Sequence, residues 1–175
     1  MSNLLKPNIK LIGVGGCGGN TIARIKSNDQ MKSIAINTDV NALSVLKDTH
    51  TFAIGPKLTN GQGAGGDPTI AKKAIKESKK QIEELLLDTD LLFITAGLGG
   101  GTGSGATPLI TEICTKNKIP TIGVFTMPFS FEGVNRTNLA NAAIENIKSN
   151  IETFIIIDNN SLLNKENRNI SIDQA

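Results

Sequence analysis

The chain of 175 residues has the length of one domain, with 39% hydrophobic and 19% charged residues and a formal net charge of +2. This near-balanced charge, with six phenylalanines as the only aromatic residues, argues against a dedicated nucleic-acid binder, which needs clustered basic residues and stacking platforms. No apolar run of transmembrane length, no apolar signal core and no cysteine framework occur, so the sequence predicts a cytoplasmic protein without direct membrane insertion.

Short apolar runs alternate with helix-like segments along the chain. In chain order we expect a strand at 9–14, a helix at 20–26, a strand at 33–37, a helix at 41–46, a strand at 51–54, a helix at 67–87, a strand at 90–96, a helix at 106–116, a strand at 120–126, a helix at 134–150 and a strand at 153–158. This alternation predicts an α/β fold with a Rossmann-like parallel sheet and helices on both faces, forming a single domain over residues 1–175.

The glycines are concentrated in three short windows. Five lie in residues 13–19, four in 61–66 and six in 97–105, which together account for 15 of the 18. A flexible linker would scatter its glycines along the chain. The clustering therefore predicts three loops with unusual backbone demands.

The first cluster fits the pattern G-x-G-x-x-G at residues 13–18, between a predicted strand and a predicted helix. Such a loop allows backbone N–H groups to approach a phosphate at a helix N-terminus. With Asp39 after the second strand as the ribose acid, it reads as a dinucleotide site, and an NAD-binding oxidoreductase domain is one hypothesis. The alternatives are a tight turn that binds nothing, and an Asp39 that merely caps the next helix.

The third cluster changes this interpretation. Six glycines within nine residues would cost a purely structural turn about 0.5–1 kcal/mol each relative to alanine. A ring of convergent amides around an anion explains that cost better. A dinucleotide dehydrogenase needs one such loop, and no Gly-Lys-Ser/Thr of an ordinary P-loop occurs. Amides, hydroxyls and a metal ion are therefore expected to hold phosphates.

Residues 99–105, Gly-Gly-Gly-Thr-Gly-Ser-Gly, are similar to the signature of the tubulin/FtsZ family. Further family motifs follow in register: Gly-Val-Gly-Gly-Cys-Gly-Gly-Asn at 13–20, Ile-Asn-Thr-Asp at 36–39, Gly-Ala-Gly-Gly-Asp-Pro at 63–68 and Met-Pro-Phe-Ser-Phe-Glu-Gly at 127–133. The Phe-Glu-Gly-x-x-Arg block and the short loops resemble the FtsZ branch rather than eukaryotic tubulin.

The resemblance implies the guanine-nucleotide-binding half of a polymer-forming cell-division GTPase, with GTP or GDP as ligand and Mg²⁺ held through the phosphates. It implies head-to-tail self-association into protofilaments, division-machinery partners, no nucleic acid and a midcell site in a bacterial cytoplasm. In the family, water attacks the γ-phosphate only when an acidic loop of the neighbouring subunit meets the nucleotide.

The resemblance also assigns roles to individual residues. Those expected at the nucleotide are Gly15, Gly16, Cys17, Gly18 and Gly19 under the α- and β-phosphates, Ala64, Gly65 and Gly66 at the γ-phosphate, Gly99, Gly100, Gly101, Thr102, Gly103 and Ser104 as the main phosphate loop, Glu132 and Arg136 at ribose or phosphate, Asn20 and Asn159 at guanine, and Asp39. No residue of this chain is assigned to catalysis or directly to a metal.

Each of these assignments has a plainer alternative. Arg136 would ordinarily be a solvated surface residue, Glu132 a loop acid favoured by a helix dipole, Asn159 an N-cap, and Cys17 a small packed residue. The sequence also departs from the family at Asp158, where proline is usual.

Residues 170–175 resemble the start of the family's long central helix. That helix, the acidic loop and the C-terminal domain are expected to be absent from this chain. It would then bind nucleotide with little or no turnover. A filament-capping interaction module without catalysis is the remaining alternative.

Overall fold

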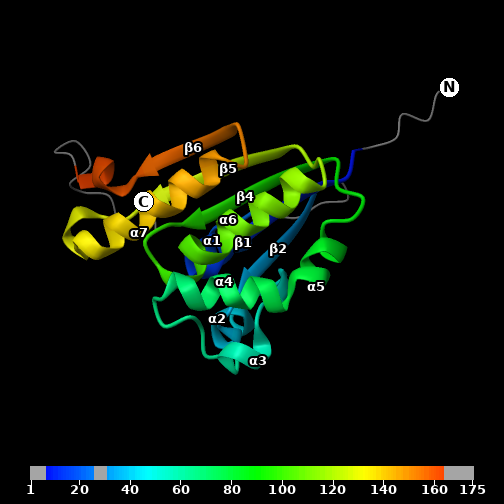
Figure 1. Cartoon of the computed structure of the whole chain (residues 1–175), viewed down its shortest axis with the longest axis horizontal. Coiled ribbons are helices and arrows are strands. Elements are labelled where there is room, and N and C mark those ends of the chain that lie inside the picture. The colour runs from blue at the N-terminus through cyan, green and yellow to red at the C-terminus, as the bar shows by residue number, and fades with distance from the viewer. Residues whose placement is uncertain (1–6, 26–30, 164–175) are drawn as a thin grey trace.

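The computed structural model describes residues 7–25 and 31–163, and its six strands form one parallel sheet (Figure 1). In chain order the strands are β1 (Ile9–Val14), β2 (Met31–Asn37), β3 (His50–Ala53), β4 (Leu91–Gly97), β5 (Thr121–Met127) and β6 (Thr153–Asp158). The predicted α/β fold with a parallel sheet is confirmed.

The strand order is β3-β2-β1-β4-β5-β6. The first strand, β1, therefore lies in the middle of the sheet, with β2 and β3 added on one side and β4, β5 and β6 on the other. β1 pairs with β2 on one side and β4 on the other, with Ile12 opposite both Ile34 and Ile94. In an open parallel sheet, the point at which the strand order reverses leaves a crevice outside the carboxyl ends of the strands. Here that point lies between β1 and β4.

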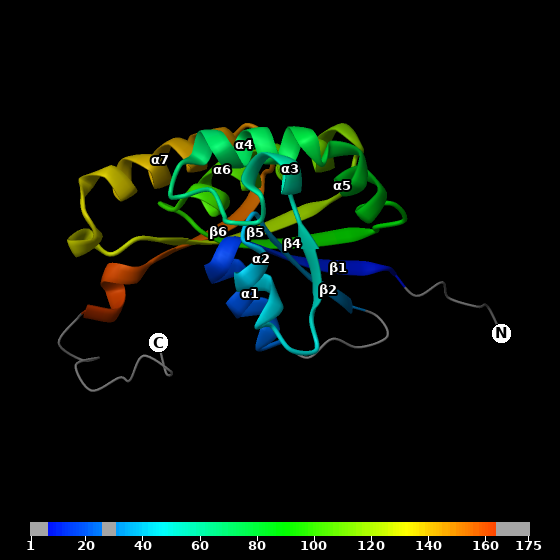
Figure 2. The ribbon, with the colours of Figure 1, turned by 90° about the horizontal axis from the view of Figure 1, so that it is seen from below.

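Helices cover both faces of the sheet (Figure 2). α1 (Gly15–Ala23) and α2 (Val40–Ser44) lie on one face, and the remaining helices form a layer on the other. That layer contains α3 (Pro56–Thr59), α4 (Pro68–Glu77), α5 (Lys79–Leu85), α6 (Gly101–Lys116) and α7 (Val134–Lys148). Two short 3-10 turns, Ser130–Glu132 and Asn159–Leu163, follow β5 and β6.

The core is divided by the sheet. A large cluster, which includes the fully buried Ile12, Ile94 and Phe125, packs beneath α4 to α7. A smaller one, with Leu11 and Ile22, packs beneath α1 and α2. Burial on both faces holds the central strands rigidly, and their carboxyl ends therefore provide a fixed platform.

Two helices begin earlier than the sequence predicted. α1 starts at Gly15 rather than at residue 20, and α6 starts at Gly101 rather than at residue 106, so both glycine clusters run into the first turns of helices. Glycine costs a helix about 1 kcal/mol relative to alanine, which is why the sequence favoured loops. Contacts between segments distant in sequence override this preference.

The predicted helix over 67–87 is divided in two at Ser78. The buried Ser78 hydroxyl accepts a hydrogen bond from the backbone N–H of Gly55, 23 residues earlier, and its backbone leaves the helical region. The short helix α3 was not predicted.

Some expectations lie outside the described residues: the end of the helix predicted at 20–26, and the central helix predicted to start at 170–175. None of the described helices combines the length and apolar character needed to cross a membrane.

Candidate functional site

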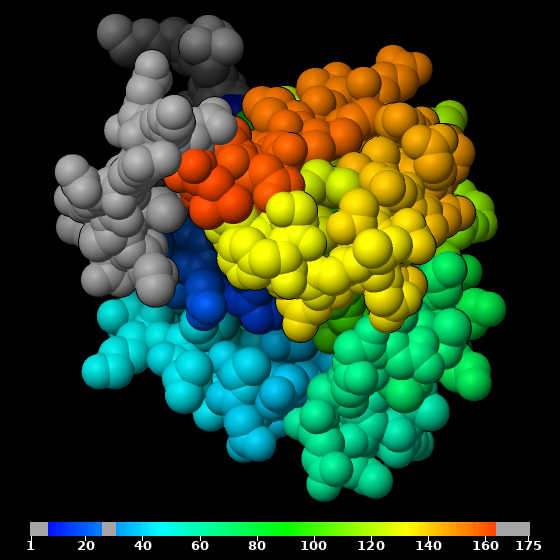
Figure 3. All heavy atoms as spheres, turned by 90° about the vertical axis from the view of Figure 1, so that its left-hand side faces the viewer, coloured from blue at the N-terminus to red at the C-terminus, as the bar shows by residue number. Residues whose placement is uncertain are grey.

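A cavity of about 310 Å³ lies at the carboxyl ends of β1, β4 and β5. Figure 3 looks onto this end, where the blue start of α1, the yellow segment after β5 and the orange-red segment after β6 lie next to one another. The size is at the lower end of the range for small-molecule sites. Its lining consists of Gly15, Gly16, Cys17, Gly97, Leu98, Gly100, Gly101, Thr102, Gly103, Thr126, Pro128, Glu132, Arg136 and Asn159.

Two helices that start within the glycine clusters, α1 and α6, begin at this cavity, and neither carries a side-chain cap. The N-cap residue of α1 is Val14 and that of α6 is Gly100. Neither residue has a side chain that accepts a hydrogen bond from the first backbone N–H groups of its helix. In contrast, α2 and α4 are capped by the carboxylates of Asp39 and Asp67. Uncapped N-terminal amides and the helix dipole together favour an anion.

The first and third glycine clusters touch each other at Gly15. Its φ is +74°, and a Cβ atom there would lie 3.2 Å from the backbone nitrogen of Gly103. A side chain at Gly15 would therefore be both strained and crowded. Glycine here allows the two uncapped helix starts to lie side by side.

The second cluster packs against the third at Gly101. A Cβ atom on Gly101 would lie 2.9 Å from both the carbonyl carbon of Gly66 and the backbone nitrogen of Asp67. The segment 61–66 is therefore held against the first turn of α6. All three clusters meet at one end of the sheet, although they are far apart in the sequence.

The charged side chains on the cavity wall are those of Glu132 and Arg136. One carboxylate oxygen of Glu132 accepts a hydrogen bond from the backbone N–H of Phe129 at 2.8 Å, and the other pairs with the Arg136 guanidinium. The side chain of Arg136 is 56% exposed and that of Glu132 24%. The pair thus presents a positive group at the rim and a carboxylate whose two oxygens are already engaged.

The structure brings many of the predicted site residues to the cavity wall. These are Gly15, Gly16, Cys17, Gly100, Gly101, Thr102, Gly103, Glu132, Arg136 and Asn159. Arg136 is mostly exposed, as the plainer alternative of a solvated surface residue expects, and its side chain also pairs with Glu132 on the wall.

Other predicted residues of the first and third clusters lie outside the lining. Gly18 and Gly19 are buried inside α1, and Asn20 is exposed on the same helix. The buried Ser104 hydroxyl accepts a hydrogen bond from the backbone N–H of Gly99 at 2.7 Å, so these two residues shape the turn between β4 and α6.

Asp39 and the second cluster also lie outside the lining. Asp39 uses its carboxylate as the N-cap of α2, accepting from the backbone N–H of Ala42 at 3.1 Å. Of the second cluster, Ala64 is buried and Gly65 and Gly66 are exposed next to the start of α6.

The sequence analysis missed Gly97, Leu98, Thr126 and Pro128 as lining residues. They lie at or just after the carboxyl ends of β4 and β5. The general rule for parallel sheets would have identified them, because ligands bind outside those ends.

The described residues contain no group of three or more His, Cys, Asp or Glu side chains that could together hold a metal ion. The donors around the cavity are backbone amides, the Thr102 and Thr126 hydroxyls, the Asn159 side-chain amide and the Arg136 guanidinium. This donor set fits phosphate oxygens better than a bare cation, so a Mg²⁺ ion fits here only together with phosphates.

Residues 8–167 match the family described as Tubulin/FtsZ family, GTPase domain. The chain is similar to an empty FtsZ dimer from M. jannaschii, with 40% identity and a TM-score of 0.90 over 98% of this chain and 50% of that one.

More distant similarity extends to the GTPγS-bound protofilament of CetZ2 from Haloferax volcanii (23% identity, TM-score 0.80, 95% of this chain and 52% of that one). It also extends to tail-truncated TubZ of Clostridium botulinum phage c-st, with 24% identity and a TM-score of 0.76 over 89% of this chain and 54% of that one. These two likenesses show a shared fold. The chain spans about half the length of each of these solved structures.

Proposed function

The chain belongs to the tubulin/FtsZ family and corresponds to its GTPase domain, and on this basis we propose that it is the guanine-nucleotide-binding part of a polymer-forming GTPase of the FtsZ type, acting in cell division. The observation that carries the proposal is the meeting of two uncapped helix N-termini at one cavity. Two phosphate-binding helix starts suit a nucleoside triphosphate better than a single phosphate.

The phosphates would be bound by backbone groups of all three clusters. The start of α1 would hold the α- and β-phosphates, and the start of α6 with Thr102 would form the main cradle. Ala64, Gly65 and Gly66 would contact the γ-phosphate, which is supported by their packing against Gly101. No lysine is needed, because amides and the helix dipoles supply the positive potential.

The sugar and base would occupy the other end of the cavity. Arg136 and Glu132 would contact ribose or phosphate, while Asn159 and Asn20 would read guanine. A site that hydrogen-bonds the guanine edge rejects adenine strongly, because the wrong base leaves polar groups unpaired. Mg²⁺ would be held by phosphate oxygens, where it supplies charge neutralisation.

Hydrolysis would require a carboxylate from outside this cavity. Among the described lining residues, Glu132 is the one carboxylate, and both of its oxygens already have partners. No unengaged carboxylate of that set is available to activate the attacking water. We therefore propose that the acidic groups come from a second subunit in a head-to-tail assembly, and that the chain alone turns over little GTP.

Calorimetric titration of the purified chain with GTP, GDP, ATP and NAD, each with Mg²⁺, tests the binding proposal. We expect GTP and GDP to bind, and ATP and NAD to bind far more weakly. A preference for NAD would overturn the proposal and revive a dinucleotide site, against which the capping role of Asp39 already argues.

Measuring phosphate release tests the proposal that hydrolysis needs a second subunit. The chain alone should release almost no phosphate from GTP, whereas sedimentation should reveal any GTP-dependent self-association. Rapid release by the chain under conditions in which it remains monomeric would contradict the need for a second subunit.

A further inference from the structure

Thr38 and Thr102, 64 residues apart, face each other with their hydroxyl oxygens 2.8 Å apart. Thr38 follows β2 and is only 1% exposed, whereas Thr102 lies in the first turn of α6 and lines the cavity. The sequence analysis gave Thr38 no role. A buried hydroxyl therefore stands directly behind a hydroxyl of the proposed phosphate site.

Burial decides which of the two oxygens donates. Each hydroxyl carries one proton, and within the described residues neither makes another hydrogen bond. If Thr102 donated, the proton of Thr38 would be left without an acceptor in a buried position, which is costly. Thr38 therefore donates to Thr102, and the proton of Thr102 is left to point into the cavity.

The backbone of Thr38 is held in place on both sides. Its N–H donates to the side-chain oxygen of Asn37 at 2.8 Å, and its carbonyl accepts from the N–H of Gly63 at 3.1 Å and from the Thr59 hydroxyl at 3.3 Å. These bonds fix the direction of the Thr38 side chain. They also tie it to the segment that leads into Ala64–Gly66.

We propose that Thr38 is a positioning residue for the phosphate site, which holds the Thr102 hydroxyl with its proton directed at a phosphate oxygen of the bound nucleotide. This inference rests on the proposed guanine-nucleotide function. Thr38 does not itself touch the nucleotide, and its effect passes entirely through Thr102. Preorganised donors bind an anion more tightly because less rotational freedom is lost on binding.

The test uses four forms of the chain: wild type, Thr38→Val, Thr102→Val and the double variant. Valine keeps the branched shape of threonine and replaces the hydroxyl by a methyl group. We expect Thr38→Val to weaken GTP binding with Mg²⁺ about five- to tenfold, a large part of one hydrogen bond to a charged group. In the Thr102→Val background the same change should have almost no effect.

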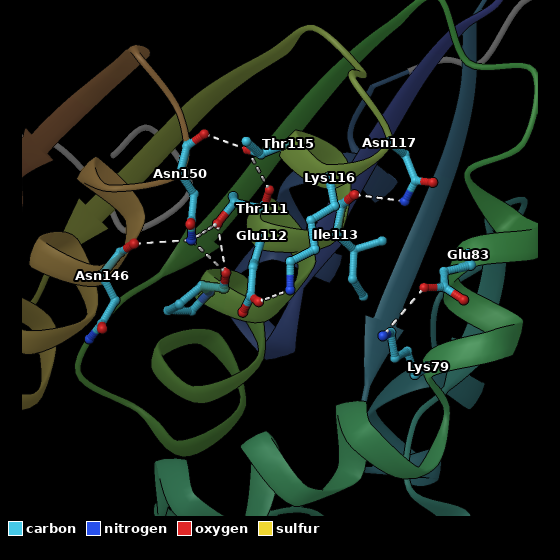
Figure 4. A network of polar contacts seen from close by, with 11 residues as sticks. Lys79, Glu83, Thr111, Glu112, Ile113, Thr115, Lys116, Asn117, Asn146 and Asn150 are labelled. Atoms are coloured by element: carbon cyan, nitrogen blue, oxygen red, sulfur yellow. Dashed lines mark hydrogen bonds and ion pairs between the residues drawn. The ribbon is translucent and has the colours of Figure 1, made fainter.

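Two controls separate positioning from general damage. Thr38→Ser retains the hydroxyl and should bind GTP like the wild type. Thr111 is a matched buried threonine on the far part of α6, where its hydroxyl donates to the carbonyl of Pro108 and accepts from Asn150 (Figure 4). Thr111→Val should lower thermal stability and leave GTP affinity unchanged.

The outcomes distinguish the two proposals. A wild-type chain that binds no GTP overturns the proposed function together with this inference. GTP binding by the wild type with no loss in Thr38→Val, or with equal loss in both backgrounds, overturns the role of Thr38 alone. If Thr38→Val fails to fold, hydroxyl-proton NMR of the wild type decides: the proton of Thr38 should exchange slowly, and protection of the Thr102 proton instead would refute the donor assignment.

Discussion

Glu132 and Arg136 form an ion pair on the cavity wall, four residues apart across the junction between a 3-10 turn and α7. An exposed pair of this kind contributes only about 0–1 kcal/mol to stability. Its position, rather than its energy, gives it a role, because it presents a guanidinium at the rim of the proposed nucleotide site.

Arg136→Met should therefore lower GTP affinity about tenfold or more, since it removes charge-assisted hydrogen bonds, while thermal stability changes little. Lys116→Met is the matched control, because Lys116 also pairs with a glutamate four residues away, but on the outer side of α6. Titration and thermal unfolding of both variants check this, and equal GTP affinity in the two would remove Arg136 from the site.

Gly16→Ala should lower GTP affinity without lowering the stability of the fold. A Cβ atom on Gly16 would meet nothing within 4 Å, and alanine is the better helix former by about 1 kcal/mol, so stability should rise or stay the same. The added methyl group would stand on the cavity wall where a phosphate is proposed to approach, and GTP affinity should fall. A Gly16→Ala variant that binds GTP normally would argue against a phosphate at the start of α1.

Gly101→Ala should lower both the stability of the fold and the affinity for GTP. Its Cβ would lie 2.9 Å from backbone atoms of Gly66 and Asp67, so the segment 61–66 must move. Overpacking of this kind costs typically about 1–3 kcal/mol. Urea unfolding and GTP titration measure the two effects, and a variant with wild-type values of both would show that this packing is not required.

The two cysteines should react very differently. Cys17 is exposed at the cavity, whereas burial raises the pKa of the Cys114 thiol to about 11. Near pH 8, a thiol reagent should modify Cys17 in the folded chain and Cys114 only after unfolding, because the thiolate is the reactive form. GTP should slow the first reaction, and Cys17→Ser should abolish it.

The raised pKa of Cys114 also gives a pH dependence. The unfolded thiol ionises near 9.0 and the folded one near 11, so the contribution of this group to stability is complete below about pH 9 and is lost as the pH rises towards 11. Cys114→Ala should show a smaller decline over this window. An identical decline in both proteins would mean that other groups cause it.

Lys10 should be a stabilising residue despite its burial. Its Nζ donates to the carbonyl oxygens of Leu85 and Leu87, each at 2.7 Å, at the C-terminal end of α5. Lys10→Met leaves both acceptors without this donor and should cost about 1–3 kcal/mol in urea unfolding. Lys32 lies opposite Lys10 in β2 and is exposed, so Lys32→Met should lower the free energy of unfolding much less.

Desolvation, and secondarily the charge of Lys32, lowers the pKa of Lys10 from 10.5. The unfolded chain then binds the proton more tightly, so the contribution of Lys10 to stability should rise with pH in the window just below 10.5. Comparing the pH slopes of the wild type and Lys10→Met checks the sign, and a steeper rise in the variant would contradict it.

The sequence by itself determined the alternation of strands and helices, because each apolar run and helical period is a local pattern. It also determined that three glycine clusters carry unusual backbone demands. Glu132, Arg136 and Asn159, which the fold brings to one wall, were indicated only by the resemblance of their motifs to the tubulin/FtsZ family. These are properties of short segments, and they can be recognised without knowing what packs against them.

Only the tertiary structure decided where α1 and α6 begin and what the glycines contact. Local propensity disfavours helix at Gly15 and Gly101, but backbone packing against Gly103 and Gly66 leaves no room for a side chain and compensates for that cost. Likewise, the Thr38–Thr102 hydrogen bond joins residues 64 positions apart. Contacts across such separations depend on the order of the strands in the sheet, which no local pattern of residues specifies.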